Sequence, residues 1–195
     1  PMELTPAILA HIEAHREEAY QLLLTLAQIP APSNHEELRA EFCKTWLEQQ
    51  GAKGVYIDEA LNVIYPIGAE GDQPLMVFMA HSDVVFPDMD TLPLKVEDGK
   101  IKCPGIGDDT ANVVALLMAA QYIAQNNLTP KNCGILVVIN SGEEGLGENA
   151  KIGISMVTPG VFLLEAPEGA DIAKHFVSDE AGKRIVNTGN GWAIQ

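Results

Sequence analysis

Three short apolar runs, well separated along the chain, predict buried strands. They are Leu75–Ala80, Gly134–Asn140 and Val161–Leu164. Uninterrupted apolar runs of this kind are typical of strands that are covered on both faces. A longer apolar segment, from Thr110 to about Asn126, has little polar face and predicts a buried helix. Buried strands that alternate with helices predict an α/β fold with a mainly parallel twisted sheet and helices on both of its faces.

The N-terminal part of the chain predicts two helices. Thr5-Pro6 matches an N-cap followed by proline at the first helical position, and a proline-rich stretch should stop this helix near Gln28. Ser33 and Glu36 have the spacing of a capping box, which predicts the start of a second helix. Gly51 is suited to the C-terminal end of that helix.

Shorter strands are predicted on either side of the first apolar run. Val55–Asp58 and Val63–Pro66 are candidates joined by a turn. Asp98-Gly99 is a favourable hairpin turn, so that Leu94–Glu97 and Lys100–Cys103 should pair with each other.

Composition narrows the classes of function. The 195 residues make one domain the default, and a hydrophobic content of 47% is enough for a substantial core. The formal net charge is -15 and the sequence pI is near 4.5. A surface this acidic argues against nucleic acid and against an anionic membrane as partners. It is compatible with cation binding, although solubility alone also accounts for it.

The cysteines and the apolar runs indicate a cytoplasmic location. Cys43, Cys103 and Cys133 are odd in number and form no CxxC pair, so neither a disulfide framework nor a thiolate zinc site is predicted. Reduced thiols fit this pattern best. None of the apolar runs reaches the roughly 20 residues of a membrane span, and the N-terminus lacks the pattern of a signal peptide.

Acidic residues and a histidine follow the predicted buried strands. His81 and Asp83 come directly after the first strand, Glu143 and Glu144 follow the second, and Glu165 ends the third. The carboxyl ends of parallel strands are where α/β proteins place their chemistry. One histidine with several carboxylates is a ligand set for zinc or a similar divalent metal, such as cobalt or manganese.

Each cluster also has a structural interpretation. His81 with Asp83 is compatible with a hydrogen-bonded core histidine, and Asp108-Asp109, which follows a Gly-x-Gly turn, with an ordinary helix N-cap. Glu143 and Glu144 are compatible with a solvated loop. A plain α/β domain with acidic loops and no metal therefore stays open as an alternative.

Three motifs together resemble a known group of enzymes. They are His81-Ser82-Asp83-Val84-Val85, Gly105-Ile106-Gly107-Asp108-Asp109 and Ser141-Gly142-Glu143-Glu144-Gly145. Their order and separation are similar to those of the metal-dependent aminoacylase and carboxypeptidase superfamily, which includes peptidase T, carboxypeptidase G and cytosolic dipeptidases. The resemblance covers roughly residues 5–168.

The resemblance implies a role for each candidate residue. His81 and Glu165 would bind one zinc ion, and Asp83 would orient His81. Asp108 would bridge two zinc ions, with a cis peptide bond to Asp109.

The second acidic pair completes the implied site. Glu144 would bind the second zinc ion. Glu143 would be the general base for a zinc-activated water that attacks a peptide or N-acyl amide carbonyl. The implied substrate is a small peptide or an acyl amino acid.

The resemblance is incomplete in one respect. Residues 1–170 are expected to form an incomplete catalytic domain, and residues 171–195 a tail that begins an inserted lid and dimerisation domain. The segment that would supply the last histidine ligand has no match in the sequence. Apolar surface left uncovered by the absent part should favour a homo-oligomer. The alternative function is a truncated or degenerate metal-binding or interaction module of the same fold, without catalysis.

Overall fold

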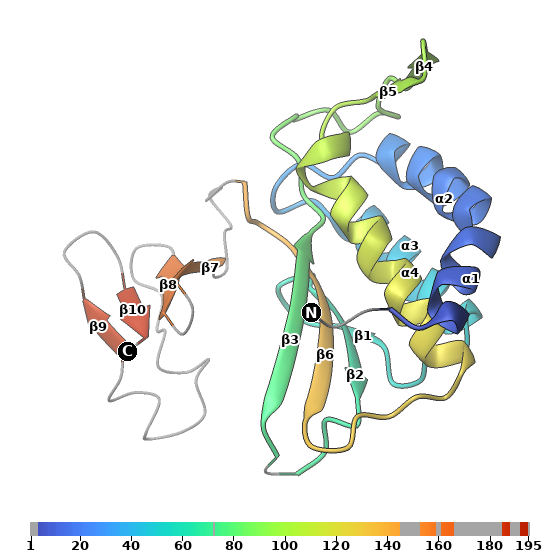
Figure 1. The fold of residues 1–195 in the computed structure, drawn as a ribbon. Coiled ribbons are helices and arrows are strands. Elements are labelled where there is room, and N and C mark those ends of the chain that lie inside the picture. Colours follow the sequence, from blue (N-terminus) through green and yellow to red (C-terminus); the bar gives the residue numbers. More distant parts are fainter. Residues whose placement is uncertain are drawn as a thin grey trace.

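The computed structural model describes residues 4–71 and 73–144 in full, and the backbone of four further strands that lie between residues 153 and 194. Its helices are α1 (Pro6–Ala14), α2 (Arg16–Gln28), α3 (Glu37–Gln49) and α4 (Ala111–Gln125), with a short helical turn, η1 (Ile106–Thr110), directly before α4. Figure 1 shows their arrangement.

The described strands form three sheets, two of them with four strands. The one with the longer strands, called the largest sheet below, has the order β1-β2-β6-β3. It is built from β1 (Tyr56–Ile57), β2 (Val63–Ile67), β6 (Gly134–Asn140) and β3 (Leu75–His81). β4 (Lys95–Glu97) and β5 (Lys100–Lys102) form the predicted hairpin around Asp98-Gly99. The third sheet has the order β7-β8-β10-β9, with β7 (Gly153–Thr158), β8 (Val161–Glu165), β9 (Ile185–Asn187) and β10 (Trp192–Ile194).

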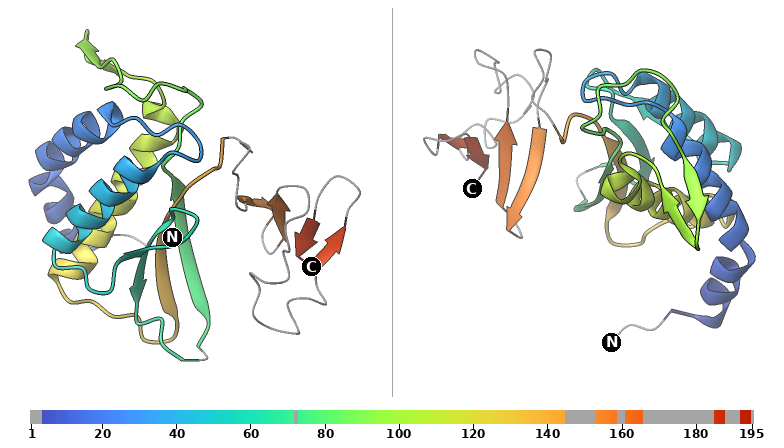
Figure 2. Two further views of the ribbon diagram at one scale, coloured as in Figure 1. Left: turned by 180° about the vertical axis from the view of Figure 1, so that it is seen from behind. Right: turned by 90° about the horizontal axis from the view of Figure 1, so that it is seen from above.

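The core lies between the largest sheet and the helices, which Figures 1 and 2 show on one side of this sheet. Side chains that alternate along the two central strands face the helices, as a pleated strand requires. They are Val63, Tyr65 and Ile67 of β2 and Val137 and Ile139 of β6. Leu26 of α2, Leu47 of α3 and Leu117 of α4 complete the core from the helix side.

The predicted α/β class is confirmed, and the sheet differs in detail from the expectation. β3 and β6 are parallel, whereas β2 pairs antiparallel with both β1 and β6. Among the described residues, helices cover one face of this sheet rather than two.

The prediction that the whole run Leu75–Ala80 is buried is wrong for the described part of the chain. β3 is an edge strand there, since β6 is its one described partner. The residues from Leu75 to Met79 are 45–51% exposed, and only Ala80 and His81 at the end of the strand are buried. An apolar run predicts a strand that is covered by other elements on both faces. Among the described residues, β3 has one neighbouring strand, and much of its surface is exposed.

The third apolar run forms a strand, but not in the predicted place. β8 pairs antiparallel with β7 and with β10, so it belongs to the third sheet and not to the sheet of β3 and β6. β10 lies beyond residue 170, and the division of the chain at that residue stays a prediction.

The N-terminal helix begins as predicted and breaks earlier. The side chain of Thr5 caps the first turn through the amide of Ile8, and Pro6 follows. The predicted single helix is, however, two helices that meet at His15, whose backbone is not helical (φ -106°, ψ 12°). The His15 ring contacts the carbonyl oxygen of His11 through Nδ1 and stacks on the His11 ring, which stabilises this break.

Within the described residues, no helix has both the length and the apolar character that crossing a membrane requires.

Candidate metal centre

His81 is the last residue of β3 and holds the centre of the site. Its side chain is 9% exposed, and its two ring nitrogens face different carboxylates. Nδ1 lies 3.1 Å from the carbonyl oxygen and 3.3 Å from Oδ1 of Asp83, and Nε2 lies 3.1 Å from Oδ1 of Asp108. Burial lowers the pKa of His81, but the contacts with Asp83 and Asp108 outweigh burial and raise it to about 9. Because Asp83 at Nδ1 is buried and Asp108 at Nε2 is exposed, Nε2 is the nitrogen that faces the open part of the site.

Asp83 lies beneath the site, fully buried, and the protein satisfies both of its carboxylate oxygens. Oδ2 accepts hydrogen bonds from Ser33 Oγ at 2.7 Å and from the Glu144 amide at 2.8 Å, while Oδ1 accepts from the Glu143 amide at 3.0 Å. Burial raises the pKa of Asp83, but these donors and His81 outweigh burial and hold the pKa below its usual value. Asp83 is therefore suited to orient His81 rather than to bind an ion.

Asp108 approaches His81 from the turn η1, which begins after Gly105. Gly105 has a positive φ of 68°, and a Cβ there would lie 2.1 Å from Val84 Cγ1, so this close approach requires glycine. The peptide bond between Asp108 and Asp109 is cis, as the resemblance implied. Oδ2 of Asp109 accepts a hydrogen bond from the His81 amide at 3.1 Å. The Asp108 side chain is 82% exposed, so its carboxylate is accessible to a ligand on the side away from its contact with His81.

Glu143 and Glu144 follow β6 on a turn that starts at Gly142, where φ is 66°. Oε2 of Glu143 lies 3.8 Å from His81 Nε2, and its side chain is 44% exposed. Burial and the charge of Asp108 raise the pKa of Glu144. Both glutamates thus face the open side of His81.

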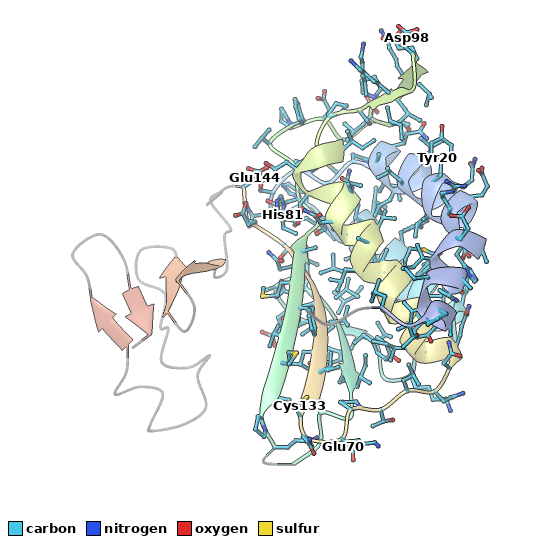
Figure 3. All side chains as sticks on the ribbon, viewed as in Figure 1. Tyr20, Glu70, His81, Asp98, Cys133 and Glu144 are labelled. Carbon is cyan, nitrogen blue, oxygen red and sulfur yellow. The ribbon has the colours of Figure 1, made fainter. Side chains whose placement is uncertain are left out.

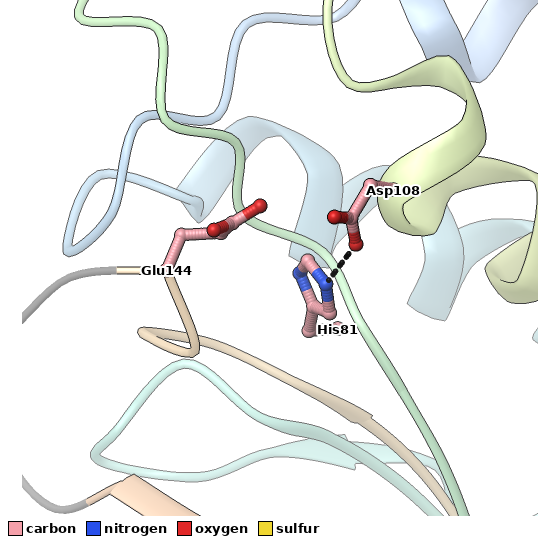
Figure 4. A group of neighbouring side chains, drawn as sticks. All are labelled: His81, Asp108 and Glu144. Carbon is pink, nitrogen blue, oxygen red and sulfur yellow. Dashed lines mark hydrogen bonds and ion pairs between the residues drawn. The ribbon is translucent and has the colours of Figure 1, made fainter.

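Three of the four predicted metal ligands converge. His81, Asp108 and Glu144 each offer one ligand atom, and these atoms all lie within 4.8 Å of one another (Figure 4). Figure 3 places His81 and Glu144 at the same end of the largest sheet, with Cys133 and Glu70 at the opposite end. One imidazole and two carboxylates at this spacing fit a divalent cation, whose charge would relieve the repulsion between the acids.

The fourth predicted ligand, Glu165, cannot be placed in the site. It ends β8, as the sequence predicts for the end of a strand, but its side chain lies outside the described residues. Its role as a ligand stays a prediction.

The prediction of a capping box at Ser33 and Glu36 is wrong. Helix α3 begins at Glu37, and the Glu36 side chain makes no cap hydrogen bond to it. Ser33 donates instead to Asp83, and Glu36 accepts from the amides of Asn34 and Gly142. The Ser-x-x-Glu spacing marked these residues, but it could not show that distant loops would compete for them.

Sequence reasoning also missed Arg39, a buried arginine of α3. Its guanidinium donates to the carbonyl oxygens of Ile29 and Ser82 and to Thr110 Oγ1. It thereby ties the end of α2 to the two segments that carry His81 and Asp108. Arginine in a helix is usually exposed to solvent, so the sequence pattern around Arg39 does not indicate this role.

Comparison with known proteins agrees with this geometry. Residues 77–185, more than half of the chain, match the model of peptidase family M20/M25/M40. The chain belongs to this family. The resemblance drawn from the three motifs is thereby confirmed at the level of a peptidase family, and the matched residues include every member of the converging group.

Solved structures show the same fold as this M20/M25/M40 chain. Human carnosine dipeptidase 1 aligns with a TM-score of 0.59 at 19% identity over 77% of this chain. Aminopeptidase PepT from Bacillus cereus gives 0.53 at 21% over 67%, and a tripeptidase from Staphylococcus aureus gives 0.52 at 25% over 66%. The chain spans 37% of the length of each of these proteins.

Proposed function

We propose that this chain is the metal-binding part of a hydrolase that cleaves a peptide or N-acyl amide bond of a small peptide or an acyl amino acid. The observation that carries the proposal is the convergence of His81, Asp108 and Glu144 within 4.8 Å at one end of the sheet. Membership of a peptidase family supports it, as does the presence of an aminopeptidase and a dipeptidase among the structures of similar fold.

The proposed ligands are His81, Asp108 and Glu144, with Glu165 as a further one, and zinc is the first candidate ion. Cobalt and manganese accept the same donors, and a second ion shared through Asp108 belongs to the same proposal. A bound divalent ion supplies a water of lowered pKa and polarises a carbonyl group.

Glu143 is the proposed general base. Its carboxylate lies beside the proposed ligands, 3.8 Å from His81 Nε2, but is accessible enough to contact a substrate. It would accept a proton from the attacking water and return that proton to the leaving amine. Asp83 holds the His81 ring from behind, so that Nε2 stays directed toward the open side.

The activity is tested by metal analysis together with hydrolysis of dipeptides, tripeptides and N-acetyl amino acids. We expect Glu143→Ala to retain zinc and to lose about 10²- to 10⁴-fold in kcat, since a general base contributes this much. Glu70→Ala, at the far end of the sheet, is the matched control and should behave as the wild type. Unchanged turnover in Glu143→Ala would remove Glu143 as the base.

A second candidate function is a metal-binding module without turnover. It is favoured by the openness of the site, because the Asp108 side chain is 82% exposed and no described segment covers it. Hydrolytic sites normally exclude bulk water during the reaction. Zinc bound without turnover in the wild type would support this candidate, and absence of zinc binding would contradict both.

Two broader expectations remain proposals. A cytoplasmic location is supported by the three free cysteines among the described residues. A homo-oligomer is supported by the exposed apolar side chains of β3, from Leu75 to Met79, on an open sheet edge. Light scattering on the purified chain measures the second directly.

A further inference from the structure

Glu36 is a fully buried carboxylate outside the proposed metal centre. It contacts the loop that carries Glu143 and Glu144. It directly precedes helix α3. Oε1 accepts hydrogen bonds from the Asn34 amide at 2.9 Å and from the Gly142 amide at 2.9 Å, which joins segments 106 residues apart in the sequence. Its neighbour Glu37 is exposed, as an acidic residue that merely favours a helix start would be.

Glu36 and Asp83 together bind three consecutive amides of one loop. The Gly142 amide donates to Glu36, and the next two amides, of Glu143 and Glu144, donate to Asp83. Hydrogen bonds from three successive N–H groups to buried carboxylates restrain the loop backbone to the observed conformation. That conformation determines where the Glu143 and Glu144 side chains point.

The burial of Glu36 indicates that its contact with the loop matters. Removing a carboxylate from water is costly unless donors replace the water. Burial raises the pKa of Glu36, and the hydrogen bonds from Asn34 and Gly142 oppose this shift. Oε2 has no partner among the described residues, so Oε1 accepts both hydrogen bonds, the local one from Asn34 and the long-range one from Gly142.

Gly142 adds a second reason why the loop needs an external support. Its φ of 66° belongs to the left-handed region, which glycine adopts easily but does not favour over other conformations. The Glu36 contact selects this conformation at the first residue of the turn, before the two glutamates.

We propose that Glu36 is a positioning residue that fixes the loop carrying Glu143 and Glu144 without touching metal or substrate. The catalytic consequence rests on the proposed function, whereas the loop geometry does not. The two parts are therefore tested separately.

The first test measures hydrogen exchange of individual amides in the metal-free chain. In Glu36→Ala the amides of Gly142, Glu143 and Glu144 should exchange at least about 10-fold faster than in the wild type, since one buried hydrogen bond is lost. The core amides of Leu117 and Ile139 should be unchanged. Glu37→Ala removes the adjacent exposed carboxylate and should leave all of these rates unchanged.

Two conservative variants separate reach from charge. Glu36→Gln keeps an acceptor oxygen at the same distance and should restore slow exchange. Glu36→Asp keeps the charge but withdraws the carboxylate by one methylene, and should resemble Glu36→Ala. If Glu36→Ala does not fold, the comparison of Glu36→Gln with Glu36→Asp tests the proposal instead. Equal exchange rates of the loop amides in these two variants would overturn it. Equal acceleration in the loop and the core would also overturn it, since that indicates general destabilisation.

The second test measures zinc affinity with a chromophoric chelator, and kcat and KM with a dipeptide. Glu36→Ala should bind zinc at least about 10-fold more weakly and lower kcat more than it raises KM, with Glu36→Gln restoring both. Unchanged zinc affinity and kcat alongside a loosened loop would overturn the catalytic part. If the wild type binds no zinc, the proposed function is wrong, and the exchange rates still decide the positioning of the loop.

Discussion

Asp83 and Asp108 contact opposite nitrogens of the same imidazole, but they lie in opposite environments. Asp83 is fully buried and accepts hydrogen bonds from one hydroxyl and two amides. The Asp108 side chain is 82% exposed, and among the described residues its one hydrogen bond is to His81. Hydrogen bonds within the protein thus satisfy the Asp83 carboxylate, whereas the Asp108 carboxylate is accessible to a ligand.

The same division extends to the neighbouring residues. Ser33 and Glu36 lie with Asp83 in an inner layer. There the two carboxylates accept from backbone amides, and Ser33 donates to Asp83. Glu143 and Glu144 lie with Asp108 in an outer layer of neighbouring acids. Burial is the first cause of the raised pKa of Glu144, and repulsion from the charge of Asp108 is the second. The inner layer should therefore contribute to folding, and the outer layer to binding a cation.

The largest expected effect comes from removing the buried carboxylate. Asp83→Ala leaves two amides and one hydroxyl without their acceptor, so the free energy of unfolding should fall by about 3–5 kcal/mol. Asp108→Ala removes an exposed group and should change it by less than about 0.5 kcal/mol. Urea unfolding in the presence of EDTA measures both values. Equal losses would remove the distinction between the two layers.

The two glycines that turn the chain toward the site provide a second comparison. Gly105→Ala forces a Cβ against the buried Val84 in addition to a positive φ, and should cost about 2–4 kcal/mol. At Gly142 the nearest atom to a new Cβ is Asn34 Oδ1 at 3.9 Å, so Gly142→Ala should cost only the backbone term of about 1–2 kcal/mol. Urea unfolding of both variants checks this order, and a larger loss at Gly142 would contradict it.

Zinc should act on the outer layer. At a concentration 100 times its dissociation constant, zinc should stabilise the chain by about 2.7 kcal/mol, and EDTA should reverse the effect. Asp108→Asn should abolish this gain, whereas Asp98→Asn, in the distant hairpin turn, should keep it. Thermal unfolding with and without zinc measures the difference. A gain that survives in Asp108→Asn would place the ion elsewhere.

The smallest expected effect is electrostatic. In the metal-free chain Glu144→Gln removes an acid from the outer layer, so the free energy of unfolding should rise by up to about 0.5 kcal/mol at low salt. The gain should vanish in 1 M salt, where the Debye length is about 3 Å. The same variant should bind zinc more weakly. A stability loss at low salt would mean that Glu144 is satisfied by the protein.

The outer layer of the site could be predicted from the sequence, and much of the inner layer could not. Asp108 and Glu144, like His81 beside them, lie at the end of a strand or after a glycine turn, and their chemistry is apparent from residue type alone. Ser33 and Glu36 have a local pattern that is equally suited to a helix cap. Which interaction forms depends on the approach of the loop at Gly142, and a contact between distant segments leaves no local pattern.

The fold was predicted best where local signals act alone. Turn residues and hydrophobic pattern are enough to predict three elements: the hairpin at Asp98-Gly99, the strand Gly134–Asn140 and the helix Ala111–Gln125. The sheet that receives β8 and the exposure of β3 depend on which strands pair. Apolar runs favour burial but do not specify a partner.

The central claim is that His81, Asp108 and Glu144 bind one divalent cation together. Anomalous diffraction at the zinc absorption edge, on a crystal grown with zinc, tests it most directly. We predict a peak bounded by His81 Nε2 and a carboxylate oxygen from each of the two acids, and no such peak in a crystal of Asp108→Asn. Carboxylates directed into solvent with no peak between them, or a peak at other residues, would contradict the account.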